Sequence, residues 1–305
     1  MSLENKKVTG VGKFKRMSTT ILSILLGIGG MLGWGIYDFL GGVFSKQIGS
    51  FKSLFWSQLA GLVSILLLTL ALNTGTNIPL LVVILSPLAA IVYSAGYLFF
   101  FKGFEKGNVS IVAATMNLWA VFTMGFAFVF MGQRLTFAQT IGVLMIISGA
   151  TLASIDWGRM KTQKPQLSLG VKEAIFGAFF FGIFWNISEV ISEEIGWLLT
   201  TLLVKAGIAI FLLIFSFAVK QEVRLTSGAT KTKQVILLMG IIEVGAVALV
   251  NYGLTIGDAI LITPIASALS IVTITLAVFF LKDKVSTIQG LGVLTAIVGI
   301  ITTAF

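Results

Sequence analysis

Long apolar runs separated by short polar breaks make up most of the sequence. A run of about 20 apolar residues is long enough for a helix to cross a bilayer, and the alternation typical of barrel strands is absent. Ten such runs are predicted, at roughly residues 20–44, 52–72, 79–101, 108–131, 136–155, 170–191, 195–219, 234–256, 259–281 and 286–305. We therefore expect an all-α polytopic membrane protein with ten transmembrane helices.

The second half of the chain repeats the first. Residues 103–149 recur without a gap at residues 253–299, an offset of 150. The matched pairs include Gly103 with Gly253, Gly107 with Gly257, Thr123 with Thr273, Gln139 with Gln289, Gly142 with Gly292 and Gly149 with Gly299. Five helices per half is an odd number, so the second half enters the membrane from the opposite side, and the two five-helix repeats are expected to be inverted.

This pattern predicts four divisions of the chain. A basic N-terminal segment occupies residues 1–18, and the first five-helix repeat occupies residues 19–156. A connecting loop at 157–168 leads to the second five-helix repeat at 169–305. The first apolar run has no small-residue cleavage site and polar stretch after it, so we interpret it as a retained first span rather than a signal peptide.

Composition strengthens the membrane assignment and removes several chemistries. Hydrophobic residues form 57% of the chain, charged residues 11%, and the mean hydropathy is +1.03. The chain has no Cys and no His, which excludes disulfides, thiolate nucleophiles and His metal sites. We expect no cofactor and no bound metal.

The net charge of +9 does not indicate nucleic-acid binding, because Lys and Arg lie at the predicted helix ends rather than along one face. The expected partners are the lipid bilayer and a small-molecule substrate, in a monomer or a homodimer. Orientation is ambiguous: six positive residues lie on the side of the termini and fourteen on the other. The five positives before the first span favour cytoplasmic termini on the same side of the membrane.

Several motifs resemble the EamA-like permeases, ten-helix members of the drug/metabolite transporter superfamily. They are the Gly103 to Gly107 stretch, the break from Gly132 to Leu135 with Gln139 and Gly142 after it, their second copies, and the opening Gly33 to Gly42. The break has Gln133 where the family frequently has Glu. The resemblance covers nearly the whole chain. It implies a secondary transporter of a small metabolite in the cytoplasmic membrane, working by alternating access with its site near the midplane between the repeats.

The first and sixth predicted helices carry the same pair of residue types. Trp34 and Asp38 lie four residues apart on one helical face, and Trp185 and Glu189 repeat that spacing. Because the repeats are inverted, the two acids are expected on opposite sides of the midplane. Our hypothesis is that the two tryptophans wall a central pocket and the acids line its two vestibules. The alternative places both acids at helix ends in the headgroup region.

Further polar residues inside predicted spans need a reason to be there, since ionisable groups at the bilayer centre are costly. Glu243 and Asn251 share a face of the eighth helix, and Tyr93 and Tyr97 occupy the equivalent face of the third. Such an arrangement suits a substrate with an amine or a flat apolar part. Lys205 either neutralises Glu243 or Glu189, or binds a substrate carboxylate.

These considerations give two sets of candidate residues. Expected at the substrate are Trp34, Asp38, Tyr93, Tyr97, Asn117, Trp119, Trp185, Glu189, Glu243 and Asn251. Expected in ion or proton coupling are Glu243, Lys205, Asp38 and Glu189, with Glu243 as the proton carrier if it is unpaired. Thr263, Ser267 and Ser270 could add hydrogen bonds to a substrate, although such residues more often bond helix to helix.

Two other functional classes remain open on the sequence. A channel or scaffold would also be helical, but a channel should show rings of like charge or a continuous polar stripe. An intramembrane aspartyl protease is suggested by Tyr37-Asp38 and Gly257-Asp258, but the second motif lacks its earlier Gly, with Thr255 in that place. No catalytic residue is therefore expected.

Overall fold

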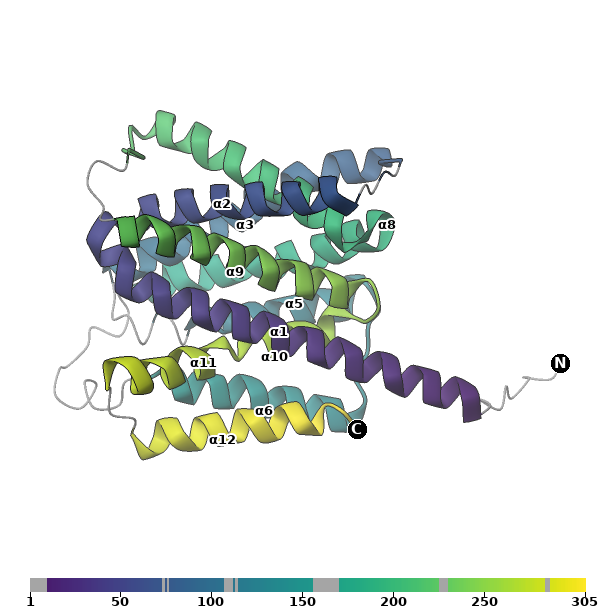
Figure 1. The fold of residues 1–305 in the computed structure, drawn as a ribbon. Helices are drawn as coiled ribbons and strands as arrows, with labels where there is room; N and C mark the ends of the chain where they lie inside the picture. The colour runs from purple at the N-terminus through teal and green to yellow at the C-terminus, as the bar shows by residue number, and fades with distance from the viewer. Residues whose placement is uncertain are drawn as a thin grey trace.

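The computed structural model describes residues 10–72, 75, 77–106, 112, 115–155, 170–224, 230–282 and 286–305. These residues form a bundle of helices without strands (Figure 1). The helices are α1 (Gly10–Ile48), α2 (Ser50–Leu72), α3 (Leu80–Lys106), α5 (Leu118–Phe130), α6 (Phe137–Ser154), α8 (Val171–Ala218), α9 (Thr230–Leu254), α10 (Ala259–Ser267), α11 (Leu269–Leu276), the π-helical segment η1 (Ala277–Leu281) and α12 (Thr287–Thr302).

Ten membrane crossings can be traced among these helices. Six of the described helices, and the continuous stretch Ala259–Phe280 that contains α10, α11 and most of η1, are long and apolar enough to span a bilayer, and α5 and α12 are shorter apolar helices. The tenth crossing comes from α8, whose 48 residues are divided by Gly196, with φ 78° and ψ 161°. That backbone conformation is accessible essentially only to glycine, so Gly196 ends one crossing and starts the next. Glu193 and Glu194, which fall in the gap between the predicted runs at 170–191 and 195–219, lie less than one turn before Gly196 and are exposed.

The helices of the two repeats exchange partners as a twofold axis requires. The first helix of each repeat contacts the third of the other: α1 packs against α9, and the first half of α8 packs against α3. Likewise α1 contacts α10 and α11, and α8 contacts α5. With five crossings in each repeat, the axis must lie in the membrane plane, which gives the inverted arrangement. Accordingly, α1 begins and α12 ends at the same end of the bundle (Figure 1), here called the terminal end.

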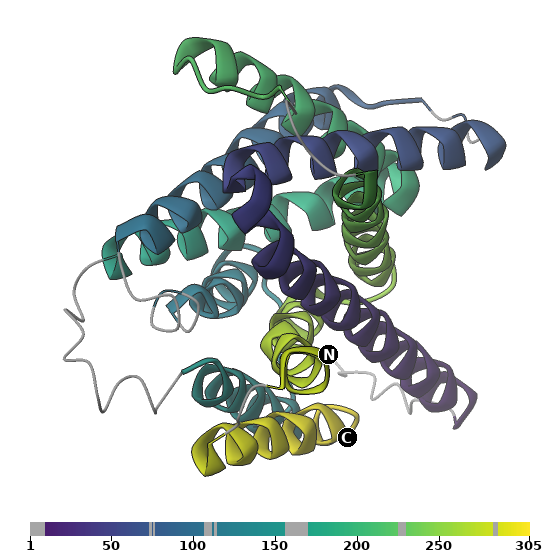
Figure 2. The same ribbon diagram turned by 60° about the vertical axis from the view of Figure 1, so that its left-hand side comes forward.

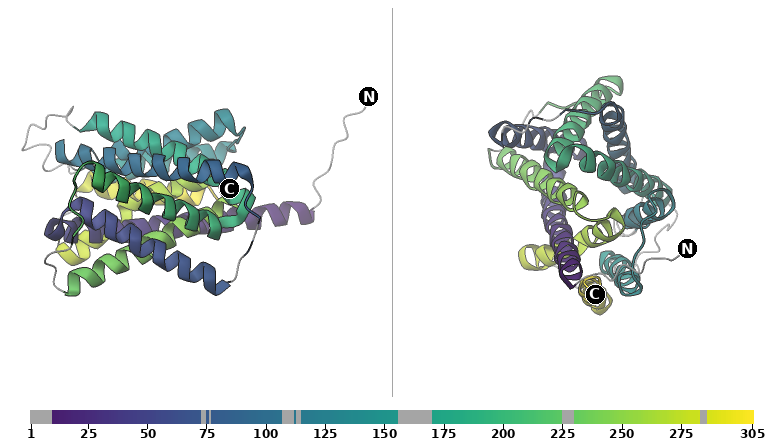
Figure 3. Two further views of the ribbon diagram at one scale, coloured as in Figure 1. Left: turned by 90° about the horizontal axis from the view of Figure 1, so that it is seen from above. Right: turned by 90° about the vertical axis from the view of Figure 1, so that its right-hand side faces the viewer.

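The fifth helices of the repeats, α6 and α12, pair with each other on one side of the bundle, and α2 and α8 meet on the other (Figure 3, right). Another view of this arrangement is given in Figure 2. The glycines that match between the repeats meet crosswise here. A Cβ on Gly292 would lie 2.7 Å from the carbonyl oxygen of Gly149, and one on Gly142 would lie 2.7 Å from that of Gly299. The duplicated glycines therefore allow two helix backbones to touch.

The duplicated glutamines have a separate role at the starts of these two helices. Gln139 and Thr136 form a capping box at α6, and Gln289 and Ser286 form the same box at α12. Each box satisfies two backbone N–H groups that a helix start leaves unpaired. Sequence identity at these positions thus records a shared helix start and not a binding function.

Exposed ion pairs join helices at the end of the bundle opposite the terminal end. Lys52 Nζ donates to Glu222 Oε2 at 2.8 Å, and this hydrogen bond holds the pKa of Glu222 below its usual range. Lys106 pairs in the same way with Glu173 across α3 and α8. The predicted connecting loop at 157–168 lies outside the described residues, as do residues 1–9 of the basic segment.

Candidate functional site

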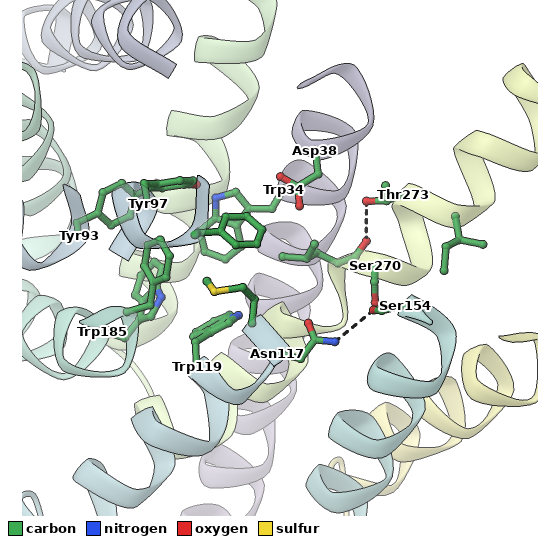
Figure 4. A pocket seen from close by; sticks show the side chains of 15 residues that line it. Trp34, Asp38, Tyr93, Tyr97, Asn117, Trp119, Ser154, Trp185, Ser270 and Thr273 are labelled. Carbon is green, nitrogen blue, oxygen red and sulfur yellow. Dashed lines mark hydrogen bonds between the residues drawn. The ribbon is translucent and has the colours of Figure 1, made fainter. Parts of the chain in front are cut away.

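A cavity of about 220 Å³ lies between the two repeats (Figure 4). It is lined by Trp34, Asp38, Tyr93, Tyr97, Phe100, Met116, Asn117, Trp119 and Ser154 from the first repeat, and by Phe181, Trp185, Leu269, Ser270, Thr273 and Ile274 from the second. The lining residues of the first repeat lie on the C-terminal parts of α1, α3 and α6 and at the start of α5. The cavity is therefore displaced from mid-bundle toward the end opposite the termini.

Three tryptophans meet at the inner end of this cavity. The ring centroids of Trp34 and Trp185 are 5.3 Å apart, and Trp119 lies 6.4 Å from Trp34 and 6.1 Å from Trp185. All three side chains are buried. Helices α1 and α8 supply equivalent residues of the two repeats, so the tryptophan cluster marks the place where the repeats meet.

Asp38 lies one helical turn beyond Trp34 and lines the cavity. It is partly buried, and no hydrogen bond or ion pair joins its carboxylate to any described residue. No Lys or Arg is found among the described residues that line the cavity. The side chain therefore presents an acceptor group to whatever fills the cavity.

Glu189 occupies a different environment on the other side of the tryptophan cluster. Its side chain is 1% exposed and lines no part of the cavity. Gln133 Nε2 donates to both carboxylate oxygens at 2.9 Å, and the backbone N–H of Ala259 donates to Oε1 at 3.0 Å. Gln133 Oε1 accepts in turn from the N–H of Ile260 at 3.1 Å. The N-terminus of α10 is thus capped by a carboxylate and an amide, which its dipole favours.

These four groups close the bundle on the side of the termini. The chain after α5, the middle of α8 and the start of α10 are all joined by this one set of bonds, here called the terminal-end lock. Gln133 suits this place because its amide donates and accepts at once, and an ionised Glu at 133 would repel Glu189. The seam is consequently asymmetric: on one side of the tryptophan cluster no described residue bonds to the Asp38 carboxylate, and on the other its repeat partner Glu189 accepts three hydrogen bonds.

Glu243 and Lys205 form a fully buried ion pair behind the cavity wall. Both side chains are 0% exposed, and Lys205 Nζ donates to Glu243 Oε1 at 2.6 Å and also to Oε2. Lys205 further donates to Gln58 Oε1 at 2.7 Å. Each charge of the pair therefore faces an opposite charge in the apolar interior.

Tyr93 connects this buried pair to the cavity. Its hydroxyl donates to Glu243 Oε1 at 2.7 Å and lies 3.5 Å from the hydroxyl of Tyr97, and its ring lines the cavity. Lys205 Nζ lies 5.4 Å from the centroid of the same ring. Glu243 itself lines no part of the cavity, so Tyr93 stands between the ion pair and any bound molecule.

Other polar candidates are engaged between helices. Asn251 does not line the cavity: its Oδ1 accepts from Ser188 Oγ at 2.8 Å, and its Nδ2 donates to Thr201 Oγ1 at 3.0 Å. Asn117 does line it, and donates to Ser154 Oγ at 3.3 Å. The hydroxyls of Thr263 and Ser267 bond to carbonyls of their own helix.

Of the ten residues predicted at the substrate, seven line the cavity and three, Glu189, Glu243 and Asn251, do not. The prediction omitted several residues that the structure places here, among them Phe181, Ser154 and Thr273. Thr273 could have been identified from the sequence, because it matches Thr123 in the repeat alignment. Ser154 and Phe181 could not be identified in this way.

Asp258, the second acid of the protease alternative, is exposed and stands at the N-cap of α10 beside the terminal-end lock. Asp38 lines the cavity on the other side of the tryptophan cluster. The two carboxylates therefore do not share one site.

Comparisons with known proteins agree with this architecture. A family model described as the EamA-like transporter family matches the chain twice, over residues 21–155 and 168–305. One solved crystal structure superposes with a TM-score of 0.73 at 15% sequence identity, covering 92% of this chain and 94% of that one, and so shares its fold. No curated protein matches the sequence significantly. The two family matches cover both repeats, and the chain belongs to the EamA-like transporter family of the drug/metabolite transporter superfamily.

Proposed function

We propose that this membrane transporter is a secondary carrier that moves a small metabolite, such as an amino acid or an amine, by alternating access. The observation that carries the proposal is the position of the cavity. It lies at the seam of two inverted repeats, with lining residues from both. In carriers of this type the site lies where one repeat rocks against the other.

The asymmetry of the seam supports alternating access. On one side of the tryptophan cluster the cavity holds Asp38, to which no described residue bonds, and on the other side Glu189 is bound into the terminal-end lock. If each of the two inverted repeats adopts the conformation of the other, the open side and the closed side of the seam exchange places. A second state would then release Glu189 and close the bundle around Asp38.

We place the protein in the cytoplasmic membrane with both termini in the cytoplasm, on the basis of the positive residues that precede the first span. In that orientation the cavity of this structure faces the outside and the terminal-end lock faces the cytoplasm. A channel would need a continuous polar path, whereas here the tryptophan cluster and the lock close the seam.

The buried ion pair bears on proton coupling. Glu243 was a candidate proton carrier on the condition that it is unpaired, and the structure pairs it with Lys205. Protonating Glu243 would leave the Lys205 ammonium buried without a counter-charge, which is costly. This favours Glu243 as a structural acid, and leaves Asp38 and Glu189 as the candidates for coupling.

Purified protein reconstituted in proteoliposomes tests the proposal. A thermal-shift screen against amino acids, amines and nucleobases selects ligands, and flux of each is then measured at two pH values. We expect saturable flux that a Trp185→Ala substitution reduces at least about tenfold, because the substitution opens the tryptophan cluster. Flux that rises linearly with concentration for every solute would contradict a carrier. If transport is proton-driven through Glu243, its pH dependence should vanish in the double variant Lys205→Met/Glu243→Gln; we expect the dependence to persist.

A further inference from the structure

Among the described residues that line the cavity, one is charged and has no ionic partner, and its charge is negative. Of the four ionisable residues predicted inside the spans, Glu243 and Lys205 neutralise each other and Glu189 accepts three hydrogen bonds. Asp38 alone has no partner among the described residues. A carboxylate within the bilayer is retained against a substantial cost, and it is normally found paired or at a functional site. No described residue supplies a cation to Asp38, so the partner that its charge calls for is a cation on the ligand.

The walls around Asp38 suit an organic cation better than a metal ion. Seven of the fifteen lining residues are aromatic: Trp34, Tyr93, Tyr97, Phe100, Trp119, Phe181 and Trp185. Aromatic faces attract ammonium groups within about 6 Å of the ring centre, and most strongly where water is excluded. A metal ion would need several oxygen ligands, and no cluster of three acidic side chains occurs among the described residues.

The cavity has two different sides. Figure 4 shows Asp38, Ser154, Ser270 and Thr273 on the side opposite Tyr93 and Trp185. A molecule with an ammonium group at one end and an apolar ring at the other matches this division. The ammonium group would lie at Asp38 and the ring among the aromatic side chains.

A carboxylate on the same molecule would find no Lys or Arg among the described residues that line the cavity. Lys205 is buried behind the cavity wall, where it is bound to Glu243 and Gln58 and is separated from the cavity by the ring of Tyr93. Binding of an anion beside Asp38 would bring two negative charges together in a site of low polarity. Zwitterionic amino acids and anions should therefore bind weakly.

Size limits the ligand further. The cavity volume of about 220 Å³ is below the roughly 300–1,000 Å³ of pockets that hold drug-sized ligands. This volume favours a small amine with one ring over peptides and nucleotides.

We infer that the cavity binds a small organic monocation, with its ammonium group paired to Asp38 and its apolar body held among Trp34, Trp119 and Trp185. The inference rests on the proposed function, because it takes this cavity as the transport site. It narrows the substrate from amino acids and amines to amines without a carboxylate.

Four probes with the same phenyl ring but different charges test the inference. They are phenethylamine, phenethyl alcohol, phenylacetate and phenylalanine, whose binding to purified full-length protein is measured by isothermal titration calorimetry. We expect phenethylamine to bind at least about 30-fold more tightly than each of the others, the factor that corresponds to about 2 kcal/mol for a desolvated charge pair. Equal affinity for the alcohol, or no binding of phenethylamine, would overturn the inference.

Variants separate the charge of Asp38 from its shape. Asp38→Asn should weaken phenethylamine binding by about 30-fold or more, and Asp38→Glu should restore part of it. Glu222→Gln is the matched control: it removes an exposed carboxylate from the same end of the bundle and should leave affinity unchanged at neutral pH. Retained affinity in Asp38→Asn with normal folding, judged by size-exclusion profile, would also overturn the inference.

The inference and the proposed function can fail separately. If phenylalanine or the alcohol shows saturable flux in proteoliposomes and phenethylamine does not, the carrier proposal stands and the cation inference falls. If phenethylamine binds through Asp38 but crosses the membrane only by a linear leak, the site is correct and the transport proposal falls.

Discussion

Removing one member of the buried Lys205–Glu243 pair should destabilise the protein far more than removing both. At an effective dielectric constant of about 20, unit charges separated by the 2.6 Å between Nζ and Oε1 attract each other by roughly 6 kcal/mol. Most of this attraction is offset by the cost of taking both charges out of water. The net contribution of the intact pair is therefore small.

A single substitution removes the attraction but keeps the desolvation cost of the remaining charge. For Glu243→Gln the remaining charge is an ammonium with 0% exposure, and its acceptors, Gln58 Oε1 and the new amide oxygen at position 243, are both neutral. The expected loss is about 3–5 kcal/mol, as for other broken buried pairs. On the scaling for globular proteins this lowers the melting temperature by about 5–10 °C in a chain of this length.

Thermal unfolding in detergent, followed by tryptophan fluorescence, compares wild type, Glu243→Gln, Lys205→Met and the double variant. The double variant carries no buried charge at either place, and we expect it to lie within about 1 kcal/mol of wild type. Tyr93→Phe is the control, since it removes one hydrogen bond to Glu243 without removing a charge, and should cost about 1 kcal/mol. A double variant as unstable as the single ones would refute this account of the pair.

Three further predictions concern helix contacts, the terminal-end lock and a surface ion pair. Gly292→Ala should cost about 1–3 kcal/mol of stability in a thermal scan because its Cβ would meet the backbone of α6, whereas Gly290→Ala on the same helix meets open space and should cost nothing measurable. Because the chain has no Cys, a single Ser192→Cys substitution gives one labelling site on the terminal-end side of the seam. We expect its rate of labelling by a maleimide to rise at least about fivefold when Gln133→Ala breaks the terminal-end lock, and an unchanged rate would contradict the proposed role of the lock. Since the pKa of Glu222 is lowered in the folded protein, its ion pair stabilises the fold above the ordinary carboxyl pKa, and that contribution should fade as the pH falls through the lowered value; it should be absent in Glu222→Gln across the same pH titration.

The fold could be predicted from the sequence because few backbone structures are stable across a bilayer. Apolar run length fixed the number of crossings, and the repeat fixed the relation between the halves. The local breaks were harder to place. The interruption of α8 falls at Gly196 rather than at Glu193 and Glu194, since a glycine-only backbone conformation sets the break and charge does not.

The candidate site could be predicted from the sequence only in part. Spacing within one helix identified Trp34 with Asp38 and Trp185 with Glu189, since residues four apart share a face. The spacing of residues within one helix does not show which hydrogen-bond partners the neighbouring helices provide. Glu189 is bound by Gln133, from the segment between α5 and α6, and by the start of α10, whereas no described residue bonds to the Asp38 carboxylate.

Residues that match between the repeats and residues that differ between them have different roles. Most of the residues that match between the repeats serve the fold, as the crosswise glycines of α6 and α12 and the two capping-box glutamines show. The residues that differ between the repeats are the informative ones at the seam. Tyr93 stands opposite Glu243 at the repeat offset of 150, and the structure joins them by a hydrogen bond.

The most direct test of the account is counterflow in proteoliposomes. Vesicles loaded with excess unlabelled phenethylamine are diluted into a trace of labelled phenethylamine, and internal label is followed with time. A carrier whose repeats expose one site alternately to each side should accumulate label transiently above the external concentration, and Asp38→Asn should abolish that overshoot. Label that only equilibrates, without an overshoot in the wild-type protein, would contradict alternating access at this cavity.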